Sequence, residues 1–277
     1  MFSYSKGKTG GYFILENIIT SKDNPTVKLY QKLSSSKKER LQYGLFVLEG
    51  LRIVEEALKE DSGITHLILT KQAREKFGET IFQADLRNTK TLVISNELGN
   101  KISSTDSTQG VFAICRIPGD KVPVFRENCR YAVLFGLQDP GNVGMIIRTA
   151  DALGIDGIIL SGSCDLYSPK VIRSTMGAVF RMELIVENDA DRLFELLKNG
   201  GVKTSAAVVD KDAENATSCG FDGKQAVFIG NEGNGLPPEI AKRCDRRITI
   251  PMNGRINSLN AAMAAGILMW ELEKKDE

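Results

Sequence analysis

Short apolar runs alternate with stretches of helical periodicity throughout residues 130–277. Each run suits one buried strand, and the segments between the runs carry apolar residues at helical spacing. Such regular alternation predicts a mostly parallel sheet covered by helices on both faces. A final helix is expected over residues 258–274. The expected strands are residues 131–137, 157–160, 182–186, 205–209, 226–229 and 247–250.

The pattern between residues 18 and 117 predicts a second, smaller α/β unit. Helical periodicity covers residues 27–33 and 53–58, and short β-rich apolar runs accompany these two segments. This alternation favours a small α/β sandwich. The expected strands are residues 45–48, 67–69, 92–94 and 111–114.

The remaining segments divide the chain. Residues 1–17 begin rich in Gly, Ser and Lys, and we expect them to form a disordered tail. Residues 118–129 contain two prolines among mixed charges, which is typical of a linker. The chain has 277 residues and so exceeds one typical domain of ~100–200 residues. We therefore predict one domain over residues 18–117 and another over residues 130–277.

Cysteine and histidine usage argues against a metal enzyme. The five cysteines are scattered with no CxxC pair, and His66 is the single histidine. A zinc site and histidine-based acid/base catalysis are therefore both disfavoured, and we predict no metal. Unpaired cysteines suit a reducing compartment. No signal-peptide pattern or apolar run of membrane-spanning length is present, so the protein is expected in the cytoplasm, away from membranes.

Positive charge is concentrated in one short stretch of the sequence. The formal net charge is only +1, but six cations crowd one short N-terminal stretch, opposed there by Asp23 and Glu39. Clustered cations can bind phosphates through counterion release. A solvated helix face explains the same pattern and is the better account of this feature taken alone. The six cations are Lys22, Lys28, Lys32, Lys37, Lys38 and Arg40.

The first stretch with candidate chemistry is residues 137–150. A strand is expected to end at Leu137, a Pro-Gly turn follows, and a helix begins near Asn142. Ligands of open α/β sheets bind beyond the carboxyl ends of the strands, so Asn142 and Arg148 suit a site. The ordinary alternatives are an N-cap for Asn142 and a surface charge for Arg148, and each is the better account of its residue alone.

The second stretch, residues 227–237, follows a buried strand with three glycines. The glycines let the backbone approach a ligand closely. Their order is GxxGxG rather than the GxGxxG of a dinucleotide-binding turn. Glu232, between Asn231 and Gly233, is hard to explain by packing.

The third stretch covers residues 248–252 and 257–266. The small residues after Asn260 predict a helix packed closely against another segment or another subunit. Ser258 is a natural N-cap for this helix. Asn260 is expected inside its first turn, where an asparagine is less easily explained.

Together with residues 168–178, these stretches resemble the SpoU (TrmH) branch of the SPOUT methyltransferases, with each motif in the family's order over residues 130 to 275. The resemblance implies a parallel α/β sheet whose C-terminal segment forms a deep trefoil knot. Such knots are rare, so periodicity could not predict one. The resemblance also implies that S-adenosylmethionine binds in the knot and that the protein forms a homodimer through the knot. The implied cofactor-binding positions are Gly230, Ile250, Met252 and Leu259.

The resemblance implies methyl transfer to a ribose 2′-OH. Arg148 would activate this hydroxyl electrostatically, since a guanidinium keeps its proton in proteins and does not act as a base. Asn142 and Asn260 would orient the ribose and the arginine. Glu232 would fix the arginine or the loop, and Ser258 would cap the final helix.

The N-terminal half resembles, more loosely, the substrate-binding module of such enzymes. Residues 103–111 match the usual end of that module. The basic cluster would then contact RNA backbone, and ribosomal RNA is favoured over tRNA.

Two other classes of function compete with this interpretation. A catalytically inactive RNA-binding or ribosome-assembly protein would retain the fold, but binding alone does not require Asn142, Arg148, Glu232 and Asn260 together. A nucleotide-dependent oxidoreductase is disfavoured because GxGxxG is missing at the first strand–helix turn.

Overall fold

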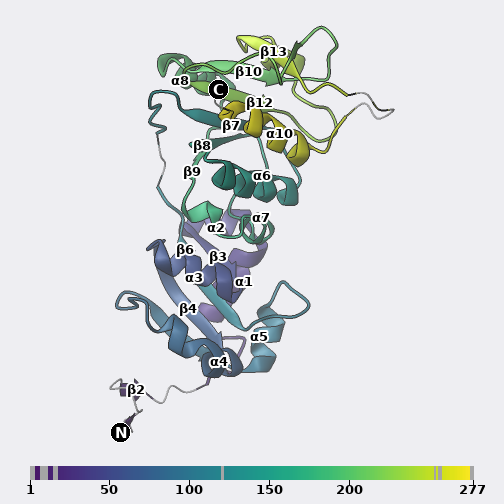
Figure 1. Cartoon of the computed structure of the whole chain (residues 1–277). Coiled ribbons are helices and arrows are strands. Elements are labelled where there is room, and N and C mark those ends of the chain that lie inside the picture. Colours follow the sequence, from purple (N-terminus) through teal and green to yellow (C-terminus); the bar gives the residue numbers. More distant parts are fainter. Residues whose placement is uncertain are drawn as a thin grey trace. The chain divides into compact units, whose positions relative to one another are not determined.

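The chain divides into two units, Met1–Ile117 and Pro118–Glu277, in the computed structural model. The structure describes residues 4–6, 12–14, 18–119, 122–252, 254 and 258–274 (Figure 1). Within the predicted disordered tail, β1 (Tyr4–Lys6) pairs with β2 (Tyr12–Ile14) in antiparallel fashion. The rest of residues 1–17 lies outside the described residues, where disorder stays a prediction.

The N-terminal unit contains a four-stranded sheet in the order β3-β6-β4-β5. Strand β6 is antiparallel to both β3 and β4, and β4 is parallel to β5. All four strands predicted in this unit are present, each extended by one to four residues. The strands are β3 (Leu45–Glu49), β4 (Ile64–Thr70), β5 (Lys90–Ile94) and β6 (Val111–Arg116).

Within residues 18–119, which the structure describes, five helices accompany this sheet. The core forms where Tyr30 meets Phe112 edge to face, with ring centroids 5.4 Å apart. Ser36 ends α1 and caps α2 by accepting from the backbone N–H of Glu39, so two helices occupy the basic region. The helices are α1 (Pro25–Ser35), α2 (Lys37–Tyr43), α3 (Leu51–Lys59), α4 (Lys71–Ile81) and α5 (Asn96–Ile102).

Arg40 is the exception within the predicted basic cluster. Its side chain is buried, at 5% exposure, and its guanidinium donates to the backbone carbonyls of Leu33 and Ser34 at the end of α1. A cation that satisfies helix-end carbonyls in this way is structural. The prediction that Arg40 contacts RNA is therefore wrong, because sequence proximity does not show which side of a helix a cation occupies.

Arg40→Ala is expected to destabilise the folded protein by about 1–3 kcal/mol, because two helix-end carbonyls lose their donor. Thermal unfolding of the full chain measures this change. Lys37→Ala, on the exposed part of the same helix, is the matched control and should change stability by less than about 0.5 kcal/mol. Equal stability of the two variants would contradict a structural role for Arg40.

The C-terminal unit contains a seven-stranded sheet in the order β11-β13-β10-β12-β7-β8-β9, with every pair parallel. The six predicted strands are present with bounds shifted by up to two residues, so the parallel sheet is confirmed. Strand β11 was missed because two polar residues carry no apolar pattern. The strands are β7 (Arg130–Phe135), β8 (Gly157–Ser161), β9 (Glu183–Val186), β10 (Lys203–Ala207), β11 (Glu214–Asn215), β12 (Gln225–Ile229) and β13 (Arg246–Thr249).

Helices cover both faces of this sheet, as the alternation predicted (Figure 1). Ala132 and Leu134 of β7 pack in one core with α6 and α10, whereas Tyr131 and Val133 pack in a second core with α8 and α9. The trefoil knot stays a prediction. The helical segments are α6 (Pro140–Leu153), α7 (Pro169–Ser174), the 3-10 helix η1 (Ala178–Phe180), α8 (Ala190–Asn199), α9 (Pro238–Ala241) and α10 (Ala261–Glu273).

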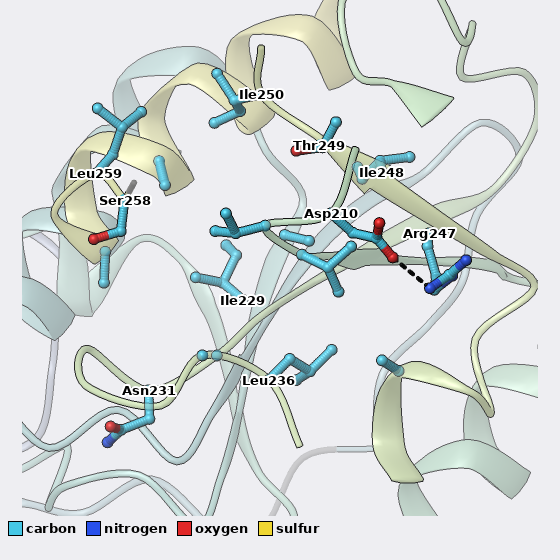
Figure 2. A pocket seen from close by; sticks show the side chains of 18 of the residues that line it. Asp210, Ile229, Asn231, Leu236, Arg247, Ile248, Thr249, Ile250, Ser258 and Leu259 are labelled. Atoms are coloured by element: carbon cyan, nitrogen blue, oxygen red, sulfur yellow. Dashed lines mark hydrogen bonds and ion pairs between the residues drawn. The ribbon is translucent and has the colours of Figure 1, made fainter. Parts of the chain in front are cut away.

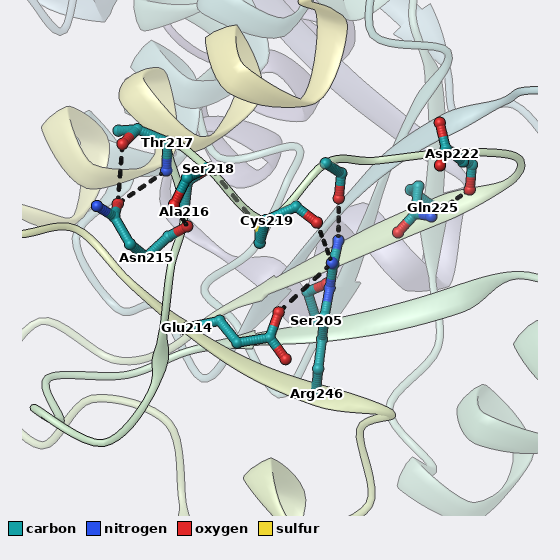
Figure 3. A network of polar contacts seen from close by, with 11 residues as sticks. Ser205, Glu214, Asn215, Ala216, Thr217, Ser218, Cys219, Asp222, Gln225 and Arg246 are labelled. Atoms are coloured by element: carbon teal, nitrogen blue, oxygen red, sulfur yellow. Dashed lines mark hydrogen bonds and ion pairs between the residues drawn. The ribbon is translucent and has the colours of Figure 1, made fainter.

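A polar network fixes the connection between β10 and β12 (Figure 3). The guanidinium of Arg246 donates to the carbonyls of Cys219 and Gly220 at 2.9 and 2.8 Å, and to Ser205 Oγ at 2.9 Å. It also lies over the ring of Phe221. Since neighbouring strand residues point to opposite faces, Arg247 is directed away from this network. This alternation on β13 separates a structural arginine from one that reaches a pocket.

Candidate active site

A cavity of about 620 Å³ opens at the carboxyl ends of β10, β12 and β13, beside the start of α10 (Figure 2). Its wall comes from three loops that follow these strands. Ile229, Ile248 and Leu268 supply apolar surface, and the loop after β12 supplies backbone. All four sequence-predicted cofactor positions line it, namely Gly230, Ile250, Met252 and Leu259.

Gly230 lies where the loop after β12 folds back on itself. Asn231 and Gly235 exchange two backbone hydrogen bonds of 3.0 and 2.9 Å across this loop. A Cβ atom at Gly230 would lie 2.1 Å from the backbone nitrogen of Leu236 and 2.4 Å from the carbonyl oxygen of Gly235. Only glycine fits there, because the obstructing atoms belong to backbone.

Three side chains from the three sequence stretches form a hydrogen-bonded chain. Asn260 Nδ2 donates to Asn142 Oδ1 at 3.1 Å, and Asn142 Nδ2 donates to Glu232 Oε1 at 3.1 Å. Glu232 also lines the cavity. This hydrogen-bonded chain of side chains therefore connects the starts of α6 and α10 with the loop after β12, although its members lie far apart in the sequence.

The Glu232 carboxylate holds the turn after β7. It accepts from the backbone N–H of Gln138 at 3.1 Å and of Asp139 at 3.0 Å. Partial desolvation would raise the pKa of Glu232, but the hydrogen bonds from Asn142 and from the backbone outweigh it and lower this pKa. The carboxylate therefore ties the turn after β7 to the loop after β12, and the role of Glu232 toward Arg148 stays a prediction.

Glu232→Gln is expected to destabilise the protein by about 1 kcal/mol, since its amide nitrogen would face a backbone N–H and water screens this exposed site. Because the pKa lies below its ordinary value of 4.5, the carboxylate stabilises the fold above that pH and loses this effect as pH falls through the lowered pKa. Thermal unfolding of both proteins, from about pH 7 to about pH 3, tests this sign. A difference that grows on acidification would contradict it.

The helix starts differ from their predicted positions. Asp139 caps α6 by accepting from the N–H groups of Gly141 and Asn142, so this helix begins at Pro140 rather than near Asn142. Asn260, and not Ser258, caps α10 by accepting from two backbone N–H groups. The prediction that Ser258 caps the final helix is therefore wrong. Ser258 instead lies exposed at the wall of the cavity (Figure 2).

Arg148 is not part of the hydrogen-bonded chain. Its side chain is exposed on α6, it does not line the cavity, and it makes no hydrogen bond or ion pair with the other described residues. One turn earlier, Gly144 packs against α7, since a Cβ there would meet Ser174 Cβ at 2.4 Å. Arg148 thus extends from a helix whose position is tightly fixed.

The predicted RNA-binding lysines all belong to the N-terminal unit. All five are exposed, and Lys28 pairs with Asp23 at 2.8 Å. A surface ion pair of this kind leaves the cation available to another anion at little cost. The lysines are Lys22, Lys28, Lys32, Lys37 and Lys38.

The sequence interpretation missed polar residues of the cavity. Asn231 Nδ2 donates to the carbonyl of Gly136 at 2.9 Å and so joins the loop after β12 to the end of β7. Asp210 and Arg247 form an ion pair of 2.7 Å at the cavity wall. Asp210 follows the predicted strand 205–209 directly, so the rule on carboxyl strand ends could have found it.

Among the described residues, no group of His, Cys, Asp and Glu side chains is arranged to hold a metal ion. None of the five cysteines, all of which lie within the described residues, forms a disulfide. In the part of the chain that the structure describes, no helix is both long enough and apolar enough to cross a membrane.

A cavity at the carboxyl ends of parallel strands, joined to a polar cluster from distant segments, is the arrangement of a ligand-binding site in an α/β protein. Comparison with known families gives the particular class: the chain belongs to the SpoU rRNA methylase family, whose model matches residues 130–270. The MRM3-like substrate binding domain matches residues 24–113. The recognition made from the motifs is therefore confirmed.

Similar proteins align with this chain over most of their length. The Bacillus subtilis 23S rRNA (guanosine(2553)-2′-O)-methyltransferase RlmP is 34% identical, covering 92% of this chain and 98% of that protein. A Streptomyces viridochromogenes 23S rRNA (uridine(2479)-2′-O)-methyltransferase is 31% identical over 91% and 90%. The AdoMet-bound rRNA methyltransferase from Sinorhizobium meliloti superposes with a TM-score of 0.82 at 31% identity, over 92% and 97% of the two chains.

Proposed function

We propose that this protein transfers a methyl group from S-adenosylmethionine to a ribose 2′-OH of ribosomal RNA. The observation that carries the proposal is the Asn260–Asn142–Glu232 hydrogen-bonded chain at the edge of the cavity. The 2′-O-methyltransferase relatives named above support the reaction, and their 23S substrates favour ribosomal RNA over tRNA.

The cavity fits the cofactor. Its volume of about 620 Å³ lies within the range of about 300–1,000 Å³ typical of small-molecule sites. Gly230 has no side chain, so a ligand can approach the backbone there. Ile250, Met252 and Leu259 offer apolar surface to an adenine. When bound, S-adenosylmethionine supplies an electrophilic methyl group on its sulfonium, so no metal is required.

The side chains of the protein would position and activate the ribose 2′-OH that accepts the methyl group. Asn142 and Asn260 orient the ribose, and Glu232 keeps the two asparagines and the turn after β7 in place. Arg148 stabilises negative charge on the 2′-oxygen as its proton leaves, to phosphate or water, since a guanidinium stays protonated and cannot accept it. Ser258, exposed at the cavity wall, donates or accepts a hydrogen bond at the bound ligand.

A homodimer would complete the site. An apolar groove runs between α6 and α10, and Met145, Met263 and Trp270 are 52%, 59% and 62% exposed there. Exposed apolar patches of this kind mark interaction surfaces. Arg148 follows Met145 by three residues and shares its helix face, so a second copy covering this groove would bring Arg148 to the subunit boundary. Light scattering should give a dimer mass, and a monomer would contradict this assembly.

The two units would have separate roles, one in RNA binding and the other in catalysis. Residues 18–117 would bind RNA through Lys22, Lys28, Lys32, Lys37 and Lys38, residues 118–129 would link the units, and residues 130–277 would carry the knot and the chemistry. We propose that the enzyme acts in the cytoplasm, where ribosomal RNA is accessible.

The test is methylation of unmodified RNA by the purified chain. Ribosomal RNA and tRNA are incubated separately with S-adenosylmethionine, digested to nucleosides and analysed by mass spectrometry. A 2′-O-methylnucleoside from ribosomal RNA alone is the expected result. Binding of cofactor and RNA without methylation of either RNA would instead identify a catalytically inactive RNA-binding protein.

A further inference from the structure

The cavity has a charged end that the proposed chemistry does not use. Asp210 and Arg247 line this end, and Arg247 Nη1 donates to Asp210 Oδ2 at 2.7 Å. Lys242 also lines the cavity. Figure 2 shows this ion pair on the side of the cavity opposite Asn231 and Ser258. The cavity therefore has one end beside the hydrogen-bonded asparagines and another that presents both signs of charge.

We propose that Asp210 and Arg247 recognise the amino-acid end of S-adenosylmethionine. Asp210 would accept from the α-ammonium group, and Arg247 would donate to the α-carboxylate. The inference rests on the proposed function only in taking S-adenosylmethionine as the ligand.

The divergence of groups at the sulfonium supports this assignment. The sulfur carries the methyl group, the adenosyl group and the aminobutyrate chain. If the methyl group faces the Asn142 and Glu232 side and the adenine takes the apolar wall at Ile250 and Leu259, the third group is directed elsewhere. The charged end is the part of the cavity that suits a zwitterion, because a carboxylate and a guanidinium complement its two charges.

The pair is preorganised but retains binding capacity. Asp210 Oδ1 accepts from the backbone N–H of Asp212 at 2.9 Å, so this carboxylate is held from two sides. Each carboxylate oxygen can accept a second hydrogen bond, and Asp210 is the one described residue to which Arg247 donates. The remaining guanidinium N–H groups are therefore available to a ligand carboxylate.

The pair contributes little to folding, which makes its variants interpretable. The side chains of Arg247 and Asp210 are 48% and 32% exposed. Ion pairs at such exposure are screened by water and add little stability. Asp210→Asn and Arg247→Gln should therefore keep the thermal unfolding temperature of the wild type.

Two ligands that differ in the amino-acid group distinguish contacts with that group from contacts with the adenosine. S-adenosylhomocysteine carries the amino-acid group, whereas methylthioadenosine has the same adenosine and sulfur without it. Calorimetric titration of the full chain is expected to show that Asp210→Asn and Arg247→Gln each weaken S-adenosylhomocysteine binding about tenfold or more. Binding of methylthioadenosine should change by less than about twofold, because the lost contacts are absent from this ligand.

Asp191→Asn is the matched control. Asp191 pairs with Arg243 at 2.8 Å on the same unit, and neither residue lines the cavity. This variant should bind both ligands as the wild type does. Equal weakening of both ligands by the Asp210 and Arg247 variants would overturn the proposal in favour of ribose recognition, and unchanged binding of both would overturn it entirely. A folded wild type that binds neither ligand would contradict the cofactor assignment itself, and that failure is visible before any variant is made.

Discussion

Arg148→Ala is expected to abolish methyl transfer while leaving cofactor binding nearly unchanged. The guanidinium is exposed and does not line the cavity, so its loss removes no cofactor contact. Loss of one preorganised group that stabilises developing negative charge costs a factor of about 10²–10³ in rate. Single-turnover methylation of ribosomal RNA measures this loss, and titration with S-adenosylhomocysteine checks the binding.

Arg148→Lys and Lys170→Ala are the controls for this experiment. Lysine keeps the positive charge but loses the planar fork of the guanidinium, so an intermediate rate is expected. Lys170 is an exposed cation on α7, the helix packed against α6, and its removal should leave the single-turnover rate at saturating RNA unchanged. Wild-type turnover in Arg148→Ala would overturn the proposed activation of the 2′-OH.

The isolation of Arg148 has a physical explanation within the proposed dimer. Met145, three residues earlier on the same helix face, and the adjacent Thr149 both line the apolar groove between α6 and α10. In the proposed dimer, Arg148 would acquire its partners from the second subunit and from the RNA. The asparagines and Glu232 need no such assembly, because they pair within one chain.

Periodicity predicted the sheet well because buried parallel strands are continuous apolar runs. It missed β11, since Glu214 and Asn215 pair with β13 at an exposed edge and carry no such run. The order of the strands in the sheet also could not be predicted from the sequence. The chain places β10 between β13 and β12, and this arrangement brings Asp210 to the cavity. The alternation of helices and strands is local, whereas the neighbours of a strand depend on the whole sheet.

The helix caps show a different limit. Ser258 and Asn260 are both good N-cap residues, and Asp139 and Asn142 compete in the same way at α6. The sequence does not decide between candidates two or three residues apart, because the choice depends on which backbone N–H groups remain unpaired. The outcome matters for the site. As a cap, Asn260 is held by Ala262 and Met263 and still donates to Asn142.

Gly230→Ala is expected to weaken binding of S-adenosylhomocysteine about a hundredfold or more and to lower the unfolding temperature. The added Cβ would lie 2.1 Å from Leu236 N and 2.2 Å from the carbonyl carbon of Gly235. These are backbone atoms that no rotamer change can move, so the loop between Asn231 and Gly235 must open. Overpacking of this kind costs about 1–3 kcal/mol, and the displaced loop also forms the cavity wall and carries Glu232.

Gly233→Ala is the matched control in the same loop. A Cβ there meets Asn231 Oδ1 at 3.5 Å, which is ordinary contact, and Gly233 does not have the positive φ angle that would disfavour alanine. This variant should keep the unfolding temperature and bind S-adenosylhomocysteine within about threefold of the wild type. Thermal unfolding and calorimetric titration of both variants separate the two positions. If Gly230→Ala bound the ligand as Gly233→Ala does, the closed loop after β12 could not be the wall against which the cofactor packs.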